Sequence, residues 1–77
     1  MAVKVILFGQ LVDITGEDTL QMEGVSDTET LQRILHAKYP SLSGRSYRIA
    51  VEKKLVTENT SLNDNSSVAL LPPFSGG

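Results

Sequence analysis

The sequence contains no cysteine, and this absence excludes several kinds of chemistry at once. Without thiols the chain can form no disulfide, zinc finger, iron–sulfur cluster, thiol nucleophile or cysteine persulfide. Charge of one sign is also scarce, because seven basic and nine acidic residues leave a net charge of −2 with no run of either sign. Nucleic-acid and anionic-membrane surfaces usually carry a basic patch, so we expect no nucleic-acid partner.

Long apolar runs are missing as well. No stretch approaches the ~20 apolar residues needed to cross a bilayer, and the first residues do not resemble a signal peptide. The 77 residues, 40% of them hydrophobic, have the size and composition of one small globular domain. We therefore expect a soluble protein of a reducing compartment, most simply the cytoplasm, with no membrane partner.

Several segments have the composition of β-strands. Val3–Phe8 is nearly all apolar, which favours a central strand covered on both faces. Thr19–Glu23 alternates apolar and polar residues, as a strand with one solvated face does. Further strands are predicted at Tyr47–Val51, Leu55-Val56 and Val68–Leu71. The turn at Lys53-Lys54 lacks the glycine or asparagine of a tight hairpin, which favours a bulge or a longer loop.

One helix is predicted between the second and third strands. Ser26-Asp27-Thr28-Glu29 matches a capping box, with Ser26 or alternatively Thr28 as the N-cap. Leu31, Ile34 and Leu35 follow at helical spacing, with Tyr39 one turn beyond. Pro40 disfavours helical geometry at the preceding residue, so the helix should end there. Ser41–Ser46 is then interpreted as a polar loop.

The predicted order of elements is ββαβββ or ββαββ, which indicates an α+β domain. One main helix laid across one face of a mixed four- to five-stranded sheet is the β-grasp arrangement. The domain is expected to span residues 1–71. Residues 72–77 are expected to form an extended tail, because Pro72-Pro73 lack the backbone donors that sheet pairing needs.

No cluster of side chains suggests catalysis or metal binding. The single histidine, His36, is predicted on the solvated side of the helix, with neither a second histidine nor a cysteine as a co-ligand. Asp13, Glu17 and Asp18 do not have the spacing of a calcium loop, and we interpret them as surface acids. We therefore expect no metal site, no cofactor bound by this chain, and no acid–base or nucleophilic catalysis by its own side chains.

The C-terminus is the segment that suggests a function. It follows directly from an apolar strand and reads Leu71-Pro72-Pro73-Phe74-Ser75-Gly76-Gly77. Two prolines stiffen its exit, and Phe74 is a large apolar side chain with no obvious core left to receive it, as in an anchor for a partner. Four extended residues at ~3.3 Å each would carry the terminal carboxylate about 13 Å beyond the prolines.

Glycine at the last two positions has a chemical rationale. Because Gly76 and Gly77 lack a Cβ, the backbone can pass through a narrow channel and adopt dihedral angles closed to other residues. The terminal carboxylate is itself unreactive, but a partner that uses ATP could convert it to an acyl adenylate. Capture by sulfide would then leave a thiocarboxylate. If this protein carries sulfur, the absence of cysteine leaves the terminal carboxylate as the only place for it.

With this order of elements and this ending, the sequence resembles the small subunit of molybdopterin synthase, a ubiquitin-like sulfur carrier. The resemblance covers essentially the whole chain, through Val3–Phe8, Tyr39-Pro40, Ala50-Val51, Leu62-Asn63-Asp64 and the Pro-Pro-x-x-Gly-Gly end.

The sequence departs from that family at three positions. Glu52 stands where the family often has Asn, and Phe74 stands where several relatives have a small or β-branched residue. Asp64-Asn65-Ser66 replaces the usual Asp-Gly-Asp turn, although Asn tolerates the left-handed conformation that glycine would supply. None of these departures touches the glycine pair, so they bear on partner contacts rather than on the chemistry.

The resemblance implies a set of partners. A ubiquitin-activating-type adenylyltransferase would use MgATP to adenylate Gly77, and a sulfurtransferase would supply the sulfur of the thiocarboxylate. The charged chain would pair with the large synthase subunit in a heterotetramer of two small and two large subunits, and would donate sulfur to the cyclic pyranopterin precursor of the molybdenum cofactor. The catalytic side chains would lie on the large subunit. Gly77 would supply the reacting atom, Gly76 the clearance, and residues 71–75 the partner contacts.

Other functions remain open at this point. A sulfur carrier for thiamine synthesis or tRNA thiolation shares the fold and the chemistry, although its tail more often lacks the Pro-Pro pair. A ubiquitin-like protein modifier would form isopeptide bonds to lysines, and such tails usually place Arg where Ser75 stands here. A non-covalent β-grasp adaptor with an incidental Gly-Gly end is a further alternative.

Overall fold

A computed structural model describes residues 2–72 of the chain. Its secondary structure consists of five strands, two α-helices and a 3₁₀-helix: β1 (Ala2–Leu7), α1 (Gln10–Thr15), β2 (Thr19–Glu23), α2 (Thr28–Lys38), η1 (Pro40–Gly44), β3 (Arg48–Val51), β4 (Lys54–Val56) and β5 (Ser67–Leu71). The strands form one sheet in the order β2-β1-β5-β3-β4. Strands β1 and β5 pair in parallel at the centre, and the other pairs are antiparallel.

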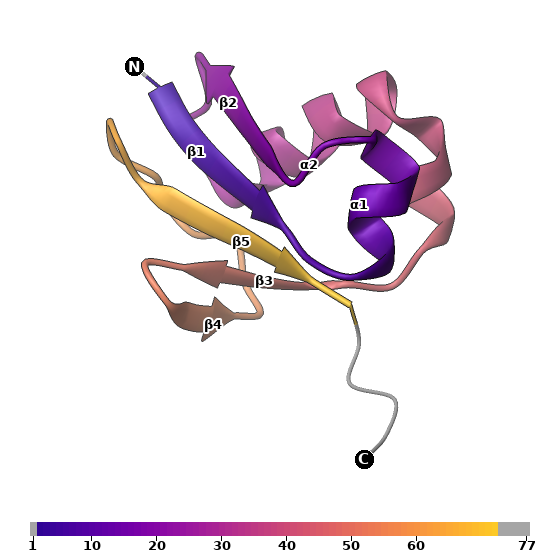
Figure 1. Cartoon of the computed structure of the whole chain (residues 1–77). Helices are drawn as coiled ribbons and strands as arrows, with labels where there is room; N and C mark the ends of the chain where they lie inside the picture. The colour runs from indigo at the N-terminus through magenta and orange to yellow at the C-terminus, as the bar shows by residue number, and fades with distance from the viewer. Residues whose placement is uncertain (1, 73–77) are drawn as a thin grey trace.

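The helices cover one face of this mixed sheet (Figure 1). Alternation along β1 explains why, because Val3, Val5 and Leu7 all point to that face and are almost fully buried. They form a single core with the buried leucines of the helical segments, Leu11, Leu31, Leu35 and Leu42. Each such side chain stabilises the fold by about 1.5–3 kcal/mol relative to exposure. The predicted α+β, β-grasp fold is confirmed.

Two short elements were not predicted from the sequence. Helix α1 follows β1 directly and buries Leu11, and it ends at Gly16, which has the left-handed φ of 78° that a helix C-terminus favours. The segment Pro40–Gly44, expected to be part of a loop, forms η1 and buries Leu42. Helices of six and five residues are too short to show a helical period in the sequence.

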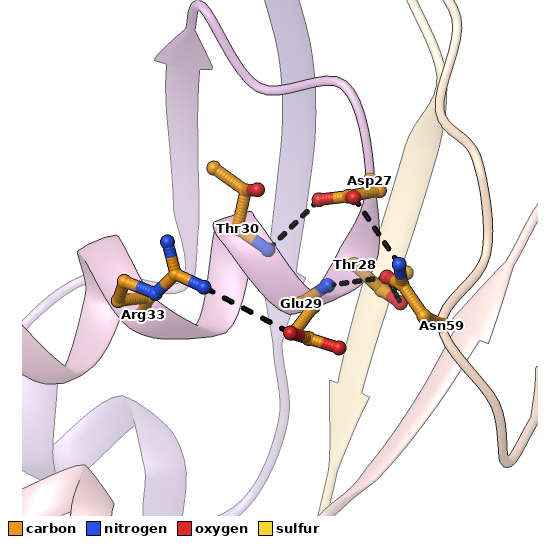
Figure 2. Close-up of polar contacts among 6 residues, drawn as sticks. All are labelled: Asp27, Thr28, Glu29, Thr30, Arg33 and Asn59. Atoms are coloured by element: carbon orange, nitrogen blue, oxygen red, sulfur yellow. Dashed lines mark hydrogen bonds and ion pairs between the residues drawn. The ribbon is translucent and has the colours of Figure 1, made fainter.

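The N-terminus of α2 is capped by Asp27, so the prediction of Ser26 or Thr28 as the N-cap was wrong by one residue. Its carboxylate accepts a hydrogen bond from the Thr30 N–H at 2.9 Å and another from Asn59 Nδ2 at 3.2 Å (Figure 2). Hydrogen bonds from Thr30 and then Asn59 lower the pKa of Asp27 from its usual 3.8. The ionised carboxylate therefore stabilises the fold at any pH above its unfolded-state pKa of 3.8. This stabilisation is lost as the pH falls through the lowered pKa of the folded state.

The same helix end is tied to the connection between β4 and β5. Asn59 Oδ1 accepts a hydrogen bond from the Glu29 N–H at 2.9 Å, and Thr28 Oγ1 accepts one from the Thr60 N–H at 2.9 Å. Thr28 is only 2% exposed, so its hydroxyl satisfies a backbone donor away from water.

We expect Thr28→Val to destabilise the domain by about 1–3 kcal/mol, because the Thr60 N–H would lose its partner in a poorly hydrated place. Thr28→Ser keeps the hydroxyl and should cost less than about 1 kcal/mol, the value of one buried methyl group. Urea denaturation of both variants measures the difference. A loss in Thr28→Ser with none in Thr28→Val would show that the methyl group, and not the hydrogen bond, is the important part.

The turn between β3 and β4 is a tight two-residue hairpin, because Val51 pairs with Lys54. The expectation of a bulge or a longer loop was therefore wrong. Both turn residues have a positive φ, 49° at Glu52 and 69° at Lys53, and residues other than glycine and asparagine rarely adopt such values. Glu52 compensates through its side chain, since Oε1 accepts a hydrogen bond from the Ser67 N–H at the start of β5, at 2.7 Å.

Candidate functional site

The C-terminal segment leaves the sheet from its centre. Strand β5 lies between β1 and β3, and its last residue, Leu71, is paired with Arg48 of β3. On the other side, the Phe8 N–H donates a hydrogen bond to the Leu70 carbonyl at 3.1 Å. Leu71 and the following Pro72 are half-buried. The chain is thus held on both sides up to the point where the tail begins (Figure 1).

Gly9 lies against the first proline of the tail. Its φ is 58°, and a Cβ added to it would come within 2.7 Å of Pro72 Cγ. A contact this close requires glycine unless the backbone or the proline moves. The position of Pro72 beside the end of β1 is therefore part of the packed domain.

Two of the predicted site residues, Leu71 and Pro72, lie in the part of the chain that the structure describes. The others lie outside it: Pro73, Phe74, Ser75, Gly76 and Gly77. The structure therefore gives the origin and surroundings of the tail, and the roles assigned to residues 73–77 remain predictions.

The face of the sheet opposite the helices carries an apolar row that the sequence analysis did not identify as a site. Strand register places Leu55, Ala50, Ala69 and Ile6 side by side across β4, β3, β5 and β1. Leu55 is 59% exposed, and Phe8, which follows β1, is 44% exposed. We call this surface the outer face, defined by Ile6, Phe8, Ala50, Leu55, Ala69 and Leu71. It adjoins the origin of the tail, because Leu71 belongs to both.

The composition of Val3–Phe8 was the signal for this surface. An apolar run on both faces of a strand predicted coverage on both sides, and β1 is indeed a central strand. The described helices cover one face only, so Ile6 and Phe8 are left half-buried and exposed. An apolar face without a covering layer next to a functional segment is typical of a protein–protein interface.

The titratable and hydroxyl side chains of residues 2–72 are dispersed over the domain. No group of three or more His, Asp or Glu residues among them could hold a metal ion. His36, expected to be solvated, is half-buried, and its Nε2 lies 2.7 Å from the Tyr47 hydroxyl. Ser43 donates its hydroxyl to the Pro40 carbonyl and so stabilises η1. No helix within this range is long and apolar enough to span a membrane.

Comparison with known proteins identifies relatives along the whole chain. A curated relative, the molybdopterin synthase sulfur carrier subunit of Caenorhabditis briggsae, is 32% identical over 100% of this chain and 99% of its own length. The solved complex of subunits 1 and 2 of the molybdopterin-converting factor from Helicobacter pylori contains a chain that is 32% identical, with a TM-score of 0.75 and complete coverage of both chains.

A third similar structure is the small archaeal modifier protein 1 of Methanosarcina acetivorans. It is 26% identical, with a TM-score of 0.83, over 99% of this chain and 96% of the other. At the level of the family, residues 5–77 match the ThiS family, a span that includes the second half of β1, the other four strands of the sheet and the Gly-Gly end. The fold, the origin of the tail and this match together show that the chain belongs to the ThiS family.

Proposed function

We propose that this protein is the sulfur carrier subunit of a molybdopterin synthase and acts in the cytoplasm. The observation that carries the proposal is the 32% identity, over the complete length of both chains, to a chain in the solved complex of subunits 1 and 2 of the molybdopterin-converting factor. The curated relative with the same level of identity has the same assigned role. A tail that begins at the centre of the sheet, beside an uncovered apolar face, suits a chain that docks and inserts its end into a partner.

The chemistry proposed for the tail takes place at the Gly77 carboxylate. A carboxylate oxygen attacks the α-phosphorus of MgATP on an adenylyltransferase, and pyrophosphate leaves. Hydrosulfide, delivered through a sulfurtransferase, then attacks the acyl carbon, and AMP leaves, so that the thiocarboxylate remains. The thiocarboxylate sulfur finally forms a bond to the cyclic pyranopterin precursor, and water cleaves the acyl–sulfur bond, which restores the Gly77 carboxylate. Two such transfers complete the dithiolene. The catalytic side chains of these steps belong to the partners.

The outer face is the proposed contact surface for the large subunit. Its centre is apolar and its small residues, Ala50 and Ala69, allow close approach of another surface. Pro72 is positioned by its contact with Gly9, so that the tail leaves from the edge of this face. Gly76 would provide clearance and Phe74 an apolar anchor within the partner.

Intact-mass spectrometry of the protein, co-expressed with its cognate adenylyltransferase and sulfurtransferase, tests the proposal. We expect a mass increase equal to the replacement of one oxygen by sulfur, localised to the C-terminal peptide. The thiocarboxylated protein should then convert the pyranopterin precursor to molybdopterin when the large subunit is added. If the thiocarboxylated protein transfers sulfur only to a thiamine precursor or to tRNA, the protein belongs to a different pathway.

The second candidate function is that of a protein modifier. The likeness to the small archaeal modifier protein 1 favours it, since that chain matches over nearly its whole length. The same co-expression separates the two functions. A modifier would give conjugates in which the Gly77 carbonyl forms an isopeptide bond to a lysine of another protein, and a dedicated carrier would give the thiocarboxylate alone.

A further inference from the structure

Charged residues are segregated along the chain although the net charge is small. Residues 10–29 carry six acidic side chains and no basic one, whereas residues 30–54 carry six basic side chains and one acidic one. The two segments reach opposite edges of the sheet, because the acidic one contains the edge strand β2 and the basic one ends at Lys54, the first residue of the opposite edge strand β4. The protein therefore has an acidic edge and a basic edge.

Two arginines of the basic segment lie next to the origin of the tail. Arg48 is paired with Leu71, the last residue of β5. Arg45 donates from Nη1 to Gln10 Oε1 at 3.3 Å, and Gln10 follows the glycine that contacts Pro72. In Figure 1 the segment that leads into β3 accordingly passes the end of β5. We call Arg45 and Arg48 the arginine pair.

The charges of the arginine pair are not neutralised within residues 2–72. The one ion pair in this part of the chain joins Arg33 to Glu29, at 3.8 Å. Arg45 has a neutral amide as its partner, and both arginines are exposed. They line one side of an open cavity of about 620 Å³, whose lining also includes Glu29 and Glu58, and neither of these carboxylates forms an ion pair with Arg45 or Arg48 within residues 2–72. Burial raises the pKa of Tyr47, so its hydroxyl stays neutral and adds no negative charge.

We propose that Arg45 and Arg48 bind carboxylates on the large synthase subunit, at the rim of the opening that receives the C-terminal segment. The inference rests on the proposed function. The length of the tail places the arginine pair at the rim of the opening and not beside the reacting groups. If Pro73–Gly77 enters the partner as an extended chain, Gly77 lies about 16 Å beyond Pro72, and the arginine pair would then lie outside the site that receives the tail end. What faces the arginine pair on docking is the surface around that site.

The inference assigns a role in association rather than in chemistry. Opposite charges that face each other across a forming interface steer the encounter and raise the association rate constant. Salt screens the effect, since the Debye length falls from about 30 Å at 0.01 M to about 3 Å at 1 M ionic strength. Steering by the arginine pair should therefore be strong in dilute buffer and weak in concentrated salt.

Stopped-flow association of the full-length protein with its cognate large subunit tests the inference. Arg45→Gln/Arg48→Gln should lower the association rate constant about tenfold at about 0.02 M ionic strength and leave it nearly unchanged at about 0.5 M. Arg33→Gln/Lys53→Gln is the matched control. It removes the same charge from α2 and from the β3–β4 turn, at the other end of β3, and should retain most of the wild-type salt dependence. Melting temperatures should be unchanged for both variants, because all four side chains are exposed.

The deciding measurement is the salt dependence of the association rate constant, compared between wild type and Arg45→Gln/Arg48→Gln. An unchanged salt dependence in this variant, or an equal loss in the control, would overturn the inference while leaving the proposed function in place. Absence of any binding between wild type and the large subunit would overturn both. Sedimentation at low ionic strength tests whether a second copy of the chain binds the arginine pair instead. Self-association that the arginine substitutions abolish would show that the arginine pair binds the acidic edge of another copy, and would overturn the inference.

Discussion

Deletion of Gly77 should reduce adenylation and sulfur transfer at least a hundredfold and leave the melting temperature of the domain unchanged. The deletion leaves Gly76 as a terminal glycine, so the chemical nature of the end is preserved. Its carboxylate, however, is withdrawn by about 3.3–3.6 Å, the length of one extended residue. Misplacement of a reacting atom by about 1 Å already costs on the order of a hundredfold in rate, so this shift should be decisive.

Two measurements make this result specific. Pyrophosphate release with the cognate adenylyltransferase follows activation, and scanning calorimetry follows the fold. Ser75→Gly is the matched control, because it changes a tail residue but keeps the length, and it should retain most of the activity. Full activity of the Gly77 deletion would place the reacting group elsewhere and exclude the carrier function.

Phe8→Ala should weaken binding to the large subunit about thirtyfold, which corresponds to about 2 kcal/mol, the usual effect of truncating a central aromatic contact. Phe8 is 44% exposed at the end of the outer face next to the tail, and a partner that covers this face would bury it. The loss should appear mainly in the dissociation rate, since Phe8 carries no charge that could steer the encounter.

Ile34→Ala provides the control for this experiment. Ile34 is another exposed large apolar residue, 40% accessible, but it lies on α2, on the other side of the sheet. Titration calorimetry should show unchanged affinity for Ile34→Ala and reduced affinity for Phe8→Ala. If both variants bind as wild type does, the outer face is not the docking surface. If the melting temperature of Phe8→Ala falls strongly, Phe8 acts mainly within the domain.

The sequence was most informative where a pattern is long enough to repeat. The alternation in Thr19–Glu23 and the helical stripe before Tyr39 predicted β2 and α2 correctly. Short elements such as α1 lack a full period, and their conformation depends on burying one leucine in a core that sequence does not display. The positive φ at Lys53 is similar, because pairing of β3 with β4 imposes a turn that the residue itself disfavours. At Asn65, by contrast, the expected tolerance of the left-handed conformation is confirmed, with φ of 67°.

The sequence likewise revealed one part of the candidate site and not the other. The tail could be identified directly from the sequence, because its proposed function depends on residue types and order at one end of the chain. The outer face could not, since Leu55 and Ile6 are separated by most of the chain and meet only through the register of four strands. Arg45 and Arg48 were inconspicuous in sequence for the same reason, and only their proximity to the end of β5 distinguishes them from other surface charges.

The parallel pairing of β1 with β5 has a consequence for the order in which the protein is made and folds. Lys4 is paired with Ser67, so the central contact of the sheet joins segments near opposite ends of the chain. Contacts at such sequence separation close late and slow folding, because a long loop must be ordered first. Until β5 has been synthesised, β1 and β3 each have an unpaired edge whose backbone groups can form hydrogen bonds with other chains. The strand that completes the domain is also the strand that carries the tail, so an incomplete chain cannot present a folded carrier to its partners.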